Sequence, residues 1–432
     1  MNDLLARLRE KHLRDTESGL CAVCSVHPVV LGCTLDAAAG RASGAVLIEA
    51  TANQVNPFGG YSGMTPADFV TYLGRLARNA DLPAERLLIG ADHLGPHVWK
   101  RLPAAEAMEK AALLAHQCVA AGFDKIHLDT VQGCADDPGP QLDLEETARR
   151  AAQLCRAAEA AARDRAHRPP PLYVIGNEVP PPGGGLEEGS DIIVTDPDQL
   201  LITLDAYQRA FTAAGVAAAW PRVMAVVVQP GVEFGDRRVV AYDKERAAAL
   251  SAAHARLPGI ITYEVHATDY QTPNALRRMV RDHFPLLKVG PCLTFALRAA
   301  LYALAGLEAA LGNDIQEPSR LPAVMEHLMV THPVHWRSHY RGSPETLHFL
   351  RHHSYRDRIR YYWSYPEARQ AVDRLLRNLA RPIAPALLER HLDGVMPICQ
   401  DNGAVFDPRG TLKAAVHAAL EPYLTPIFVT HI

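Results

Sequence analysis

The stretch LLIGADHLGPHV at residues 87–98 guides the interpretation of the rest of the chain. Its first residues are apolar and few enough for a buried β-strand, yet the run ends on two titratable side chains, Asp92 and His93. A buried charged group needs a partner or an ion to offset the cost of leaving water. The stretch therefore predicts either a hydrogen-bonded structural pair at a strand end or one part of an active site.

Similar apolar runs recur along the chain, and helical stretches rich in alanine separate them. With the first stretch they give eight predicted strands, at 21–26, 45–50, 86–92, 125–129, 172–178, 222–229, 260–266 and 286–290. The predicted helices lie near 33–43, 66–79, 103–121, 143–166, 197–215, 242–256, 272–283 and 292–312. Strands that are apolar almost throughout are typical of a parallel sheet covered by helices. Eight such units predict an α/β fold, a (β/α)8 TIM barrel with a C-terminal helical extension.

A doubly wound open sheet is the alternative fold, but no GxGxxG motif follows any predicted strand. The alternation of strands and helices stops near residue 313. We expect a barrel with an N-terminal helix over 1–312, and a helical extension over 313–432 that packs on the barrel or at a subunit interface. Breaks in the extension are expected at Pro333, Gly342, Pro366, Pro382 and Pro385.

The composition argues against several classes of protein. Hydrophobic residues make up 48% of the 432 residues and the net charge is -4, so neither nucleic acid nor an anionic membrane is an expected partner. The N-terminus lacks a signal-peptide core, and no apolar run approaching ~18 residues is evident, so no membrane span is expected. The lone CxxC of Cys21 and Cys24 lies in an apolar run, which favours buried thiols over a metal or redox site and suits the cytoplasm.

Polar side chains gather at the carboxyl ends of the predicted strands. In a TIM barrel these ends meet at one mouth, where barrel enzymes place their active sites. A single acid at a strand end is usually a structural cap, but recurrence on at least six consecutive strands predicts a functional site. The candidates are Glu49, Asn53, Gln54, Asp92, His93, His127, Asp129, Asn177, Glu178, Gln229, Glu264, His266, Asp269 and Lys288.

This set of residue types predicts a metal site. His93, Glu178 and His266 offer nitrogen and oxygen ligands to a divalent ion such as zinc or manganese, with positions left open for substrate. Asp92 and Asp129 are then neighbouring acid–base groups, with Glu49 as a further catalytic candidate. A sugar carbonyl bound to such an ion would be polarised, which stabilises an enediolate or alkoxide.

Further polar residues are candidates for substrate binding. Amides suited to sugar hydroxyls are Asn53 and Gln54, in a glycine-containing loop over 51–66, and Gln229. Lys288 is expected either to bind a phosphate or to pair with Glu264 or Glu49. Gly290 opens a helix where barrels often bind phosphate.

A basic and aromatic cluster lies in the extension, in SYRDRIRYYW at 354–363. If this segment is helical, Arg356 and Arg360 lie one turn apart on the same face. Such a pair can receive a phosphate, which makes Arg360 a substrate-binding candidate. A packing face or a subunit interface is the more common use of such a cluster and stays open.

The chain resembles the accessory subunits of tagatose-bisphosphate aldolase, the GatZ/KbaZ/AgaZ family. The resemblance is carried by IEATANQVNPFGGYSGMTPADF (48–69), ADHLGPHVW (91–99), AGFDKIHLD (121–129), VIGNEVPPPGG (174–184), VVVQPGVEF (226–234), YEVHATDYQT (263–272), LKVGPCLTFALR (287–298) and DRIRYYW (357–363). Ala52 departs from the serine usual in the family. The resemblance implies a TIM barrel, a cytoplasmic location and a role in galactitol or N-acetylgalactosamine catabolism.

The same resemblance implies two different roles. Some relatives are non-catalytic partners that stabilise a class II aldolase subunit, whereas others act alone as 4-epimerases of D-tagatose 6-phosphate or the free ketose. The pair Asp92–His93 is similar to the Asp-His-Gly of class II aldolases, but Leu94 intervenes before Gly95, and no glycine-flanked histidine ligands follow.

A pure scaffold has no need of a converging set of buried charges, so the sequence favours a metal-dependent epimerase that works by retro-aldol cleavage. A sugar kinase is disfavoured because no glycine-rich phosphate cradle is present. The expected partners are a ketose or ketose phosphate, further copies of the chain in a homo-oligomer and, for the accessory role, a class II aldolase subunit.

Overall fold

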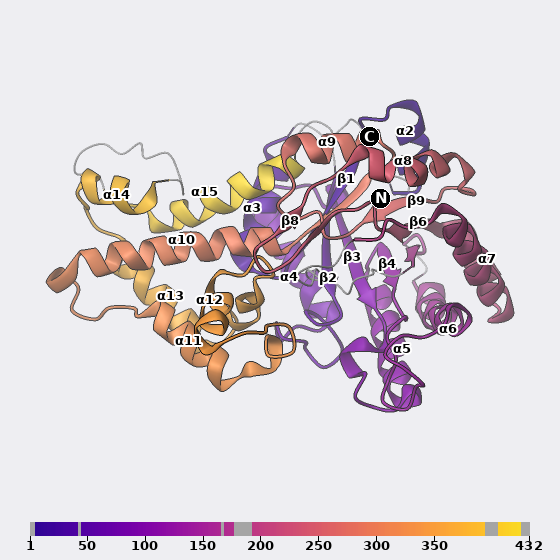
Figure 1. Ribbon diagram of the computed structural model, residues 1–432, viewed down its shortest axis with the longest axis horizontal. Coiled ribbons are helices and arrows are strands. Elements are labelled where there is room, and N and C mark those ends of the chain that lie inside the picture. The colour runs from indigo at the N-terminus through magenta and orange to yellow at the C-terminus, as the bar shows by residue number, and fades with distance from the viewer. Residues whose placement is uncertain (1–4, 42–44, 166–167, 177–191, 394–404, 425–432) are drawn as a thin grey trace.

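The computed structural model of the protein describes residues 5–41, 45–165, 168–176, 192–393 and 405–424. Eight parallel strands close into a barrel (Figure 1). Their order is β1-β2-β3-β4-β5-β6-β9-β10, and β10 pairs back to β1. The strands are β1 Leu20–Cys24, β2 Val46–Thr51, β3 Leu87–Leu94, β4 Lys125–Leu128, β5 Leu172–Ile175, β6 Val223–Val228, β9 Thr262–Val265 and β10 Leu286–Val289. Each falls within or overlaps a predicted strand, so the TIM barrel is confirmed and the open sheet is excluded.

A helix follows each of the eight barrel strands along the chain, as the sequence predicts. These helices are α3 Pro28–Ala39, α4 Pro66–Asn79, α5 Ala104–Ala121, α6 Leu144–Arg163, α7 Pro197–Ala213, α8 Lys244–Ala253, α9 Pro273–Arg281 and α10 Pro291–Ala310. Helix α2 Leu8–Arg14 precedes the barrel, and a two-stranded antiparallel pair, β7 Glu233–Phe234 and β8 Val239–Val240, follows β6. Because the strands are covered by these helices, their residues are buried almost without exception.

Helix starts follow local capping chemistry. Helix α4 begins with a capping box between Thr65 and Asp68, with Pro66 in its first turn, at the residue that the sequence predicts. Helix α3 begins at Pro28, earlier than the predicted start at 33. The reason is that His27 Nδ1 accepts a hydrogen bond from the Val29 N–H, a cap concealed within a continuous apolar run.

In β3 and the turn that follows it, neighbouring groups approach the backbone so closely at two positions that only glycine fits. A Cβ at Gly90 would lie 2.7 Å from the Glu49 carboxylate, so glycine leaves room for that side chain inside the barrel. A Cβ at Gly95 would lie 1.7 Å from the Asp129 carbonyl oxygen, a clash that no side-chain movement relieves. The glycine pattern of residues 87–98 therefore reflects the shape of the barrel interior and its mouth.

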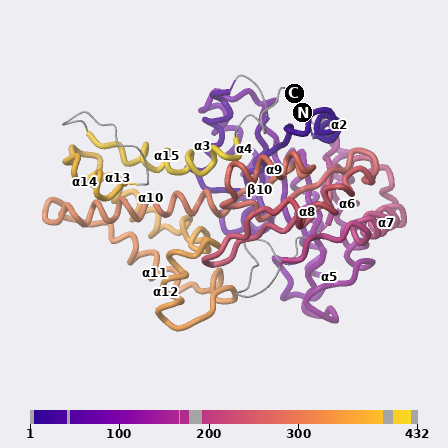
Figure 2. Tube along the Cα trace, turned by 45° about the horizontal axis from the view of Figure 1, so that its top comes forward, coloured from indigo at the N-terminus to yellow at the C-terminus, as the bar shows by residue number. Residues whose placement is uncertain are grey.

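The extension lies beside the barrel along α10, which runs outward from it (Figures 1 and 2). Its helices are α11 Leu321–Thr331, α12 Pro344–His353, α13 Pro366–Leu379, α14 Pro385–Leu392 and α15 Pro408–Leu420. Helix α15 packs against α10 and α3, and α13 and α14 pack against α10. Pro366 and Pro385, expected as breaks, occupy the first turns of helices. The division at residue 312 remains a prediction.

Helix α10 corrects one expectation from the sequence. By length and composition alone its 20 residues suffice to cross a membrane, whereas the sequence pattern predicts no such run. Of its 18-residue apolar window, 56% is buried, Arg298 pairs with Asp357 at 3.3 Å, and Glu308 accepts a 3.0 Å hydrogen bond from the Ser319 N–H. Because protein groups satisfy both charges, α10 is a core helix shared by the barrel and the extension.

Candidate active site at the barrel mouth

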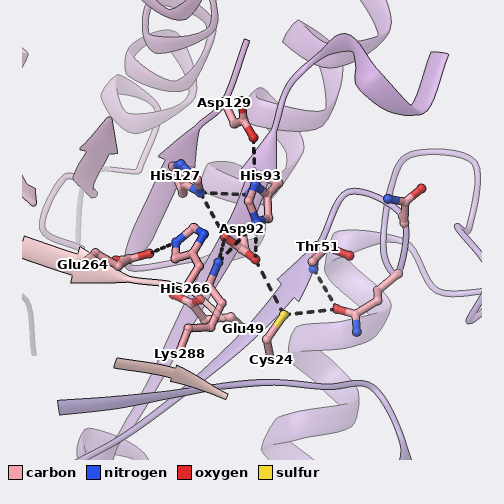
Figure 3. Close-up of polar contacts among 12 residues, drawn as sticks. Cys24, Glu49, Thr51, Asp92, His93, His127, Asp129, Glu264, His266 and Lys288 are labelled. Carbon is pink, nitrogen blue, oxygen red and sulfur yellow. Dashed lines mark hydrogen bonds and ion pairs between the residues drawn. The ribbon is translucent and has the colours of Figure 1, made fainter. Parts of the chain in front are cut away.

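Five buried side chains from β3, β4, β9 and β10 or their ends converge at the mouth of the barrel (Figure 3). This mouth cluster consists of Asp92, His93, His127, His266 and Lys288. The three imidazole ring centroids lie 4.9 to 5.2 Å apart. One donor atom of each histidine and of Asp92 lie within 4.8 Å of one another, which is an arrangement that can hold a metal ion.

His93 is held in an unusual conformation. Its φ of 49° is in the left-handed region, and the register between β3 and β4 shifts between Ala91 and Leu94. Its Nδ1 lies 2.8 Å from Asp129 Oδ2, and Nε2 faces the other members of the cluster (Figure 3). A carboxylate that binds one ring nitrogen fixes the direction of the other, as in many metal sites. Backbone strain of this kind is concentrated at functional sites.

His266 is oriented by a carboxylate in the same way. Its Nε2 lies 2.8 Å from Glu264 Oε1, which turns Nδ1 towards the mouth cluster (Figure 3). His127 differs: Nε2 lies 3.1 Å from the Gly176 carbonyl oxygen, and Nδ1 lies 3.0 Å from Asp92 Oδ1 and 3.2 Å from the His93 backbone nitrogen. His93 and His266 therefore have the orientation expected of metal ligands, and His127 braces the backbone that carries His93.

Asp92 interacts with most of the other titratable side chains of the mouth cluster. Its Oδ1 lies 2.5 Å from Lys288 Nζ and 3.0 Å from His127 Nδ1. Burial raises the pKa of Asp92, but His93, Lys288 and His127 together outweigh burial and hold that pKa well below its ordinary value. Of the alternatives that the sequence leaves open for Lys288, the structure shows an ion pair within the mouth, with Asp92 as the partner and not Glu264 or Glu49.

Asp129 is ionised for the same physical reason. Burial raises its pKa, but the hydrogen bond and charge of His93 prevail and lower the pKa to about 2. Its Oδ1 is buried without a hydrogen-bond partner among the described residues. Asp129 contacts His93 directly, so its carboxylate can orient the His93 ring as a metal ligand.

A second layer of charge lies inside the barrel beside the mouth cluster. Lys125 is fully buried, with Nζ 2.5 Å from Glu49 Oε1 and 2.6 Å from Glu264 Oε2. Burial raises the pKa of Glu49, with Lys125 acting in the opposite direction. Glu49 is therefore an internal ion-pair partner, and oxygens of Glu49, Asp92 and Glu264 still lie within 4.8 Å of one another.

The charge balance of this region suits a divalent cation. Four carboxylates, from Glu49, Asp92, Asp129 and Glu264, face only two ammonium groups, from Lys125 and Lys288. Excess negative charge in a buried site is costly unless an ion or a proton offsets it. Imidazole and carboxylate donors suit zinc or manganese. The residues present therefore fit a bound metal ion.

The other predicted site residues lie in different places. Asn53 is exposed and its Nδ2 lies 3.3 Å from His97 Nε2. The Gln229 Oε1 accepts hydrogen bonds from the Gly231 and Val232 N–H groups, so its carboxamide shapes the loop after β6. Neither touches the mouth cluster. Glu178, predicted as a metal ligand, lies outside the described residues, as does Asn177.

A cavity of about 430 Å³ adjoins the mouth cluster, and Gln54, Gly290 and Arg360 line it. The condition under which Arg356 and Arg360 would share a helix face is not met, because residues 354–363 form only a 3₁₀ turn, at Arg358–Tyr362. The turn separates the two arginines: Arg356 faces Asp236, with Nε 3.5 Å from Oδ1, whereas Arg360 borders the cavity.

Comparison with known proteins assigns a family. Residues 5–427 match the family described as D-tagatose-1,6-bisphosphate aldolase subunit GatZ/KbaZ-like. The chain belongs to this GatZ/KbaZ-like family. It is 45% identical over 424 residues to a D-tagatose 6-phosphate 4-epimerase of Agrobacterium fabrum, with 98% of both chains covered. A solved structure of a probable tagatose 6 phosphate kinase from Sinorhizobium meliloti matches with a TM-score of 0.82 and 42% identity, covering 94% of this chain and 99% of that one.

Two contributors to this GatZ/KbaZ-like site are missing from the set that the sequence predicts. Lys125 lies two residues before His127 in the same strand, so alternation alone puts both side chains on the inner face. Cys24, expected only as a buried thiol, borders the cavity with Sγ 3.7 Å from Asp92 Oδ2. Burial raises the pKa of Cys24 well above its ordinary value, so the thiol is neutral.

Proposed function

We propose that this protein is a metal-dependent 4-epimerase that interconverts D-tagatose 6-phosphate and D-fructose 6-phosphate. The observation that carries the proposal is the mouth cluster, in which Asp129 and Glu264 orient His93 and His266 towards Asp92. The full-length relative at 45% identity is named for this reaction. The GatZ/KbaZ-like family supports a phosphorylated ketose as the class of substrate.

The chemistry follows from the position of the reacting carbon. C4 is not adjacent to the C2 carbonyl, so its hydrogen is not acidic enough for simple removal. Cleavage of the C3–C4 bond avoids this difficulty, because the electron pair is delocalised into the C2 carbonyl as an enediolate. The released aldehyde turns its other face to the enediolate, and the re-formed bond has the inverted configuration at C4.

Asp92 is suited to move the proton in this reaction. Its Oδ2 lies 3.7 Å from Sγ of Cys24, which lines the cavity, so the carboxylate is placed to accept the proton of the C4 hydroxyl as the C3–C4 bond breaks. The same group returns the proton when the bond re-forms. The Lys288 ammonium, 2.5 Å from Asp92, holds positive charge beside the enediolate.

We infer that His93 and His266 hold the metal ion, with Asp92 as an oxygen donor nearby, and we keep Glu178, which lies outside the described residues, as a further candidate ligand. Zinc or manganese fits imidazole and carboxylate ligands. When bound, the ion supplies Lewis-acid polarisation of the substrate's carbonyl oxygen. Asp129 and Glu264 then act as positioning residues, because each fixes the ring of a ligand histidine.

The comparisons suggest two alternative functions, an aldolase accessory subunit and a sugar-phosphate kinase. The family's name supports an aldolase accessory subunit, which would stabilise a separate catalytic chain. The structural relative is named as a kinase, but this sequence has no GxGxxG or GxxxxGK motif to bind nucleotide phosphates. A scaffold has no use for a buried excess of carboxylates, so the epimerase is preferred.

One assay separates these functions. The purified chain is incubated alone with D-tagatose 6-phosphate and Zn²⁺, Mn²⁺ or Mg²⁺, and D-fructose 6-phosphate is measured with a coupled enzyme. We expect turnover with at least one metal and none after chelation. Absence of turnover with every metal, together with activation of a class II aldolase on mixing, would establish the accessory role. Production of ADP from ATP would establish the kinase.

We further propose that the barrel over 1–312 and the extension over 313–432 form one catalytic unit that assembles as a homo-oligomer in the cytoplasm. The seven cysteines in the described part of the chain are all free, which suits a reducing compartment.

A further inference from the structure

The cavity beside the mouth cluster is built jointly by the barrel and the extension. Its barrel side includes Cys24, Gln54 and Gly290, and its extension side includes Arg360 and Trp363. At about 430 Å³ it falls within the size range of small-molecule sites, roughly 300–1,000 Å³. Two side-chain contacts fix the extension over the mouth: Ser364 Oγ donates to the Tyr61 carbonyl at 3.0 Å, and the Tyr61 and Tyr361 rings lie 4.7 Å apart.

The inner end of this cavity reaches the mouth cluster through one side chain. Cys24 lines the cavity, and its Sγ lies 3.8 Å from Gln54 Oε1. The same Sγ lies 3.7 Å from Asp92 Oδ2 (Figure 3). Asp92 Oδ1 is engaged by Lys288 and His127, so Oδ2 is the oxygen on the cavity side. A molecule that reacts at Asp92 would therefore extend its distal end into this cavity.

Arg360 presents a positive charge to the cavity. Its guanidinium is held by the carbonyls of Arg356 and Asp357, by the Tyr361 hydroxyl, and by the Tyr361 ring with a centroid 4.6 Å away. Within the described residues, no carboxylate lies within 4.0 Å of this guanidinium, whereas Arg150, Arg222, Arg298, Arg351 and Arg356 each have one. The carboxylate of Asp357 is itself engaged by Thr294 and Arg298. Arg360 is thus a firmly held cation that forms no direct ion pair within the described chain.

Other features of the cavity also favour an anion. The first turn of α3 lines it at His27, Pro28 and Val29, which brings the positive end of that helix dipole to the cavity. Ser25 Oγ accepts a hydrogen bond from the His27 N–H at 3.2 Å, and its hydroxyl hydrogen is left as a donor. At the outer rim, Arg409 and Lys413 add positive charge, although each has a carboxylate partner.

We propose that this cavity binds the phosphoryl group of the ketose and that Arg360 makes the enzyme selective for phosphorylated over free ketoses. This inference rests on the proposed epimerase function, because it places the reacting carbons at Asp92. The guanidinium fork suits two phosphate oxygens, and the largely apolar surroundings strengthen the attraction. The extension would then contribute directly to substrate recognition.

The test compares substrates that differ only in the phosphate. Arg360→Gln removes the cation, Arg360→Lys keeps a point charge without the fork, and Arg341→Gln removes an exposed charge of the extension that does not line the cavity. We expect Arg360→Gln to raise KM for D-tagatose 6-phosphate about 10–100-fold, with Arg360→Lys intermediate and Arg341→Gln unchanged. Turnover of free D-tagatose should change less than threefold in all three variants. Equal losses for both substrates, or an unchanged KM for the phosphorylated one, would overturn the inference.

A binding measurement keeps this inference separate from the proposed function. Calorimetric titration with D-fructose 6-phosphate, D-fructose and inorganic phosphate requires no turnover. Arg360-dependent binding of D-fructose 6-phosphate by a chain without epimerase activity would refute the proposed function and retain the phosphate subsite. Epimerisation whose KM does not depend on Arg360 would retain the function and refute the subsite. Failure of the wild-type chain to prefer D-fructose 6-phosphate over D-fructose would also refute it.

Discussion

Two clusters of histidine and carboxylate side chains, one at the barrel mouth and one in the extension, use similar residues in opposite arrangements. The extension cluster consists of Glu326 on α11 and His348, Arg351 and His352 on α12. Here the carboxylate is central: Glu326 lies 3.1 Å from each of the two histidine rings and 2.8 Å from Arg351 Nε. At the mouth, the carboxylates of Asp129 and Glu264 lie outside the histidines and direct their rings inward.

The difference shows that spacing of ligand-type residues is a weak criterion for a metal site. Donor atoms of Glu326, His348 and His352 lie within 4.8 Å of one another, as those of the mouth cluster do. Arg351, however, neutralises Glu326 by a bidentate pair, so a metal ion there would have to displace a guanidinium. The mouth also holds a cation, since Lys288 Nζ lies 2.5 Å from Asp92 Oδ1 and 3.4 Å from His93 Nε2, but its four carboxylates outnumber its two ammonium groups. Charge balance and the side from which the carboxylate approaches thus distinguish the two clusters.

The largest expected difference between the two clusters is in catalysis, which should depend on the mouth cluster and not on the extension cluster. Asp92→Asn removes the proton acceptor with little change of shape, and we expect kcat to fall about 10²–10⁴-fold. Glu326→Gln in the extension is the matched control and should leave kcat unchanged. Rates are measured with D-tagatose 6-phosphate at saturating metal. A loss of less than tenfold for Asp92→Asn would show that another group moves the proton.

The next effect concerns metal affinity. Asp129→Asn keeps the ring contact with His93 but removes the charge that fixes its tautomer and direction, so metal affinity should fall about 10–100-fold. Affinity is measured by competition with a chromophoric chelator. His348→Ala, which removes a histidine from the extension cluster, should bind metal as the wild type does. Loss of metal from His348→Ala and not from Asp129→Asn would reverse the assignment of the two clusters.

The barrel is predictable from the sequence because each strand is buried on both faces and reads as an apolar run between helices. Which strand-end side chains meet is also predictable, since parallel strands all end at one mouth. Which of them pair is not. Lys288 pairs with Asp92 across the barrel, from β10 to β3, and not with a neighbouring strand. Such pairing depends on strand tilt and on side-chain length, neither of which the sequence displays.

The extension is less predictable because it has no repeated unit. Prolines mark helix boundaries there, but the sequence does not show which of them are starts. The 3₁₀ turn that carries Arg360 is not predicted because its residues have no helical or strand period. Its shape is fixed by tertiary contacts, including the Arg298–Asp357 pair and the left-handed conformation of Asp357. The role of Arg360 can therefore be inferred only from the folded chain.

A smaller effect is expected on the stability of the fold. Substitutions in the extension cluster should lower the free energy of unfolding and leave catalysis unchanged. Glu326→Ala leaves the Arg351 guanidinium, which is 9% exposed, without its charge-assisted hydrogen bonds. We expect the free energy of unfolding to fall by about 2 kcal/mol, because hydrogen bonds to charged groups contribute about 1.5–3 kcal/mol. Thermal melting of the metal-free protein measures the change. Glu326→Gln, which retains an acceptor, should lose less, and equal melting of all three chains would contradict the proposed structural role of Glu326.

The smallest expected effect is the pH dependence of the extension cluster. Burial lowers the pKa of His352 from 6.5 to about 4, with Glu326 acting weakly in the opposite direction. Because the folded pKa is depressed, the unfolded chain binds more protons between these values. The stability that neutral His352 contributes is therefore fully present above pH 6.5 and is lost as the pH falls towards 4.

Melting temperatures of the wild type and of His352→Gln, measured across this window, isolate the contribution of His352 from those of other histidines. We expect the difference in melting temperature between the two chains to be constant above pH 6.5. Below pH 6.5 the melting temperature of the wild type should fall relative to that of His352→Gln. A difference that stays flat down to pH 4 would mean that His352 is protonated in the folded chain and pairs with Glu326 as a cation.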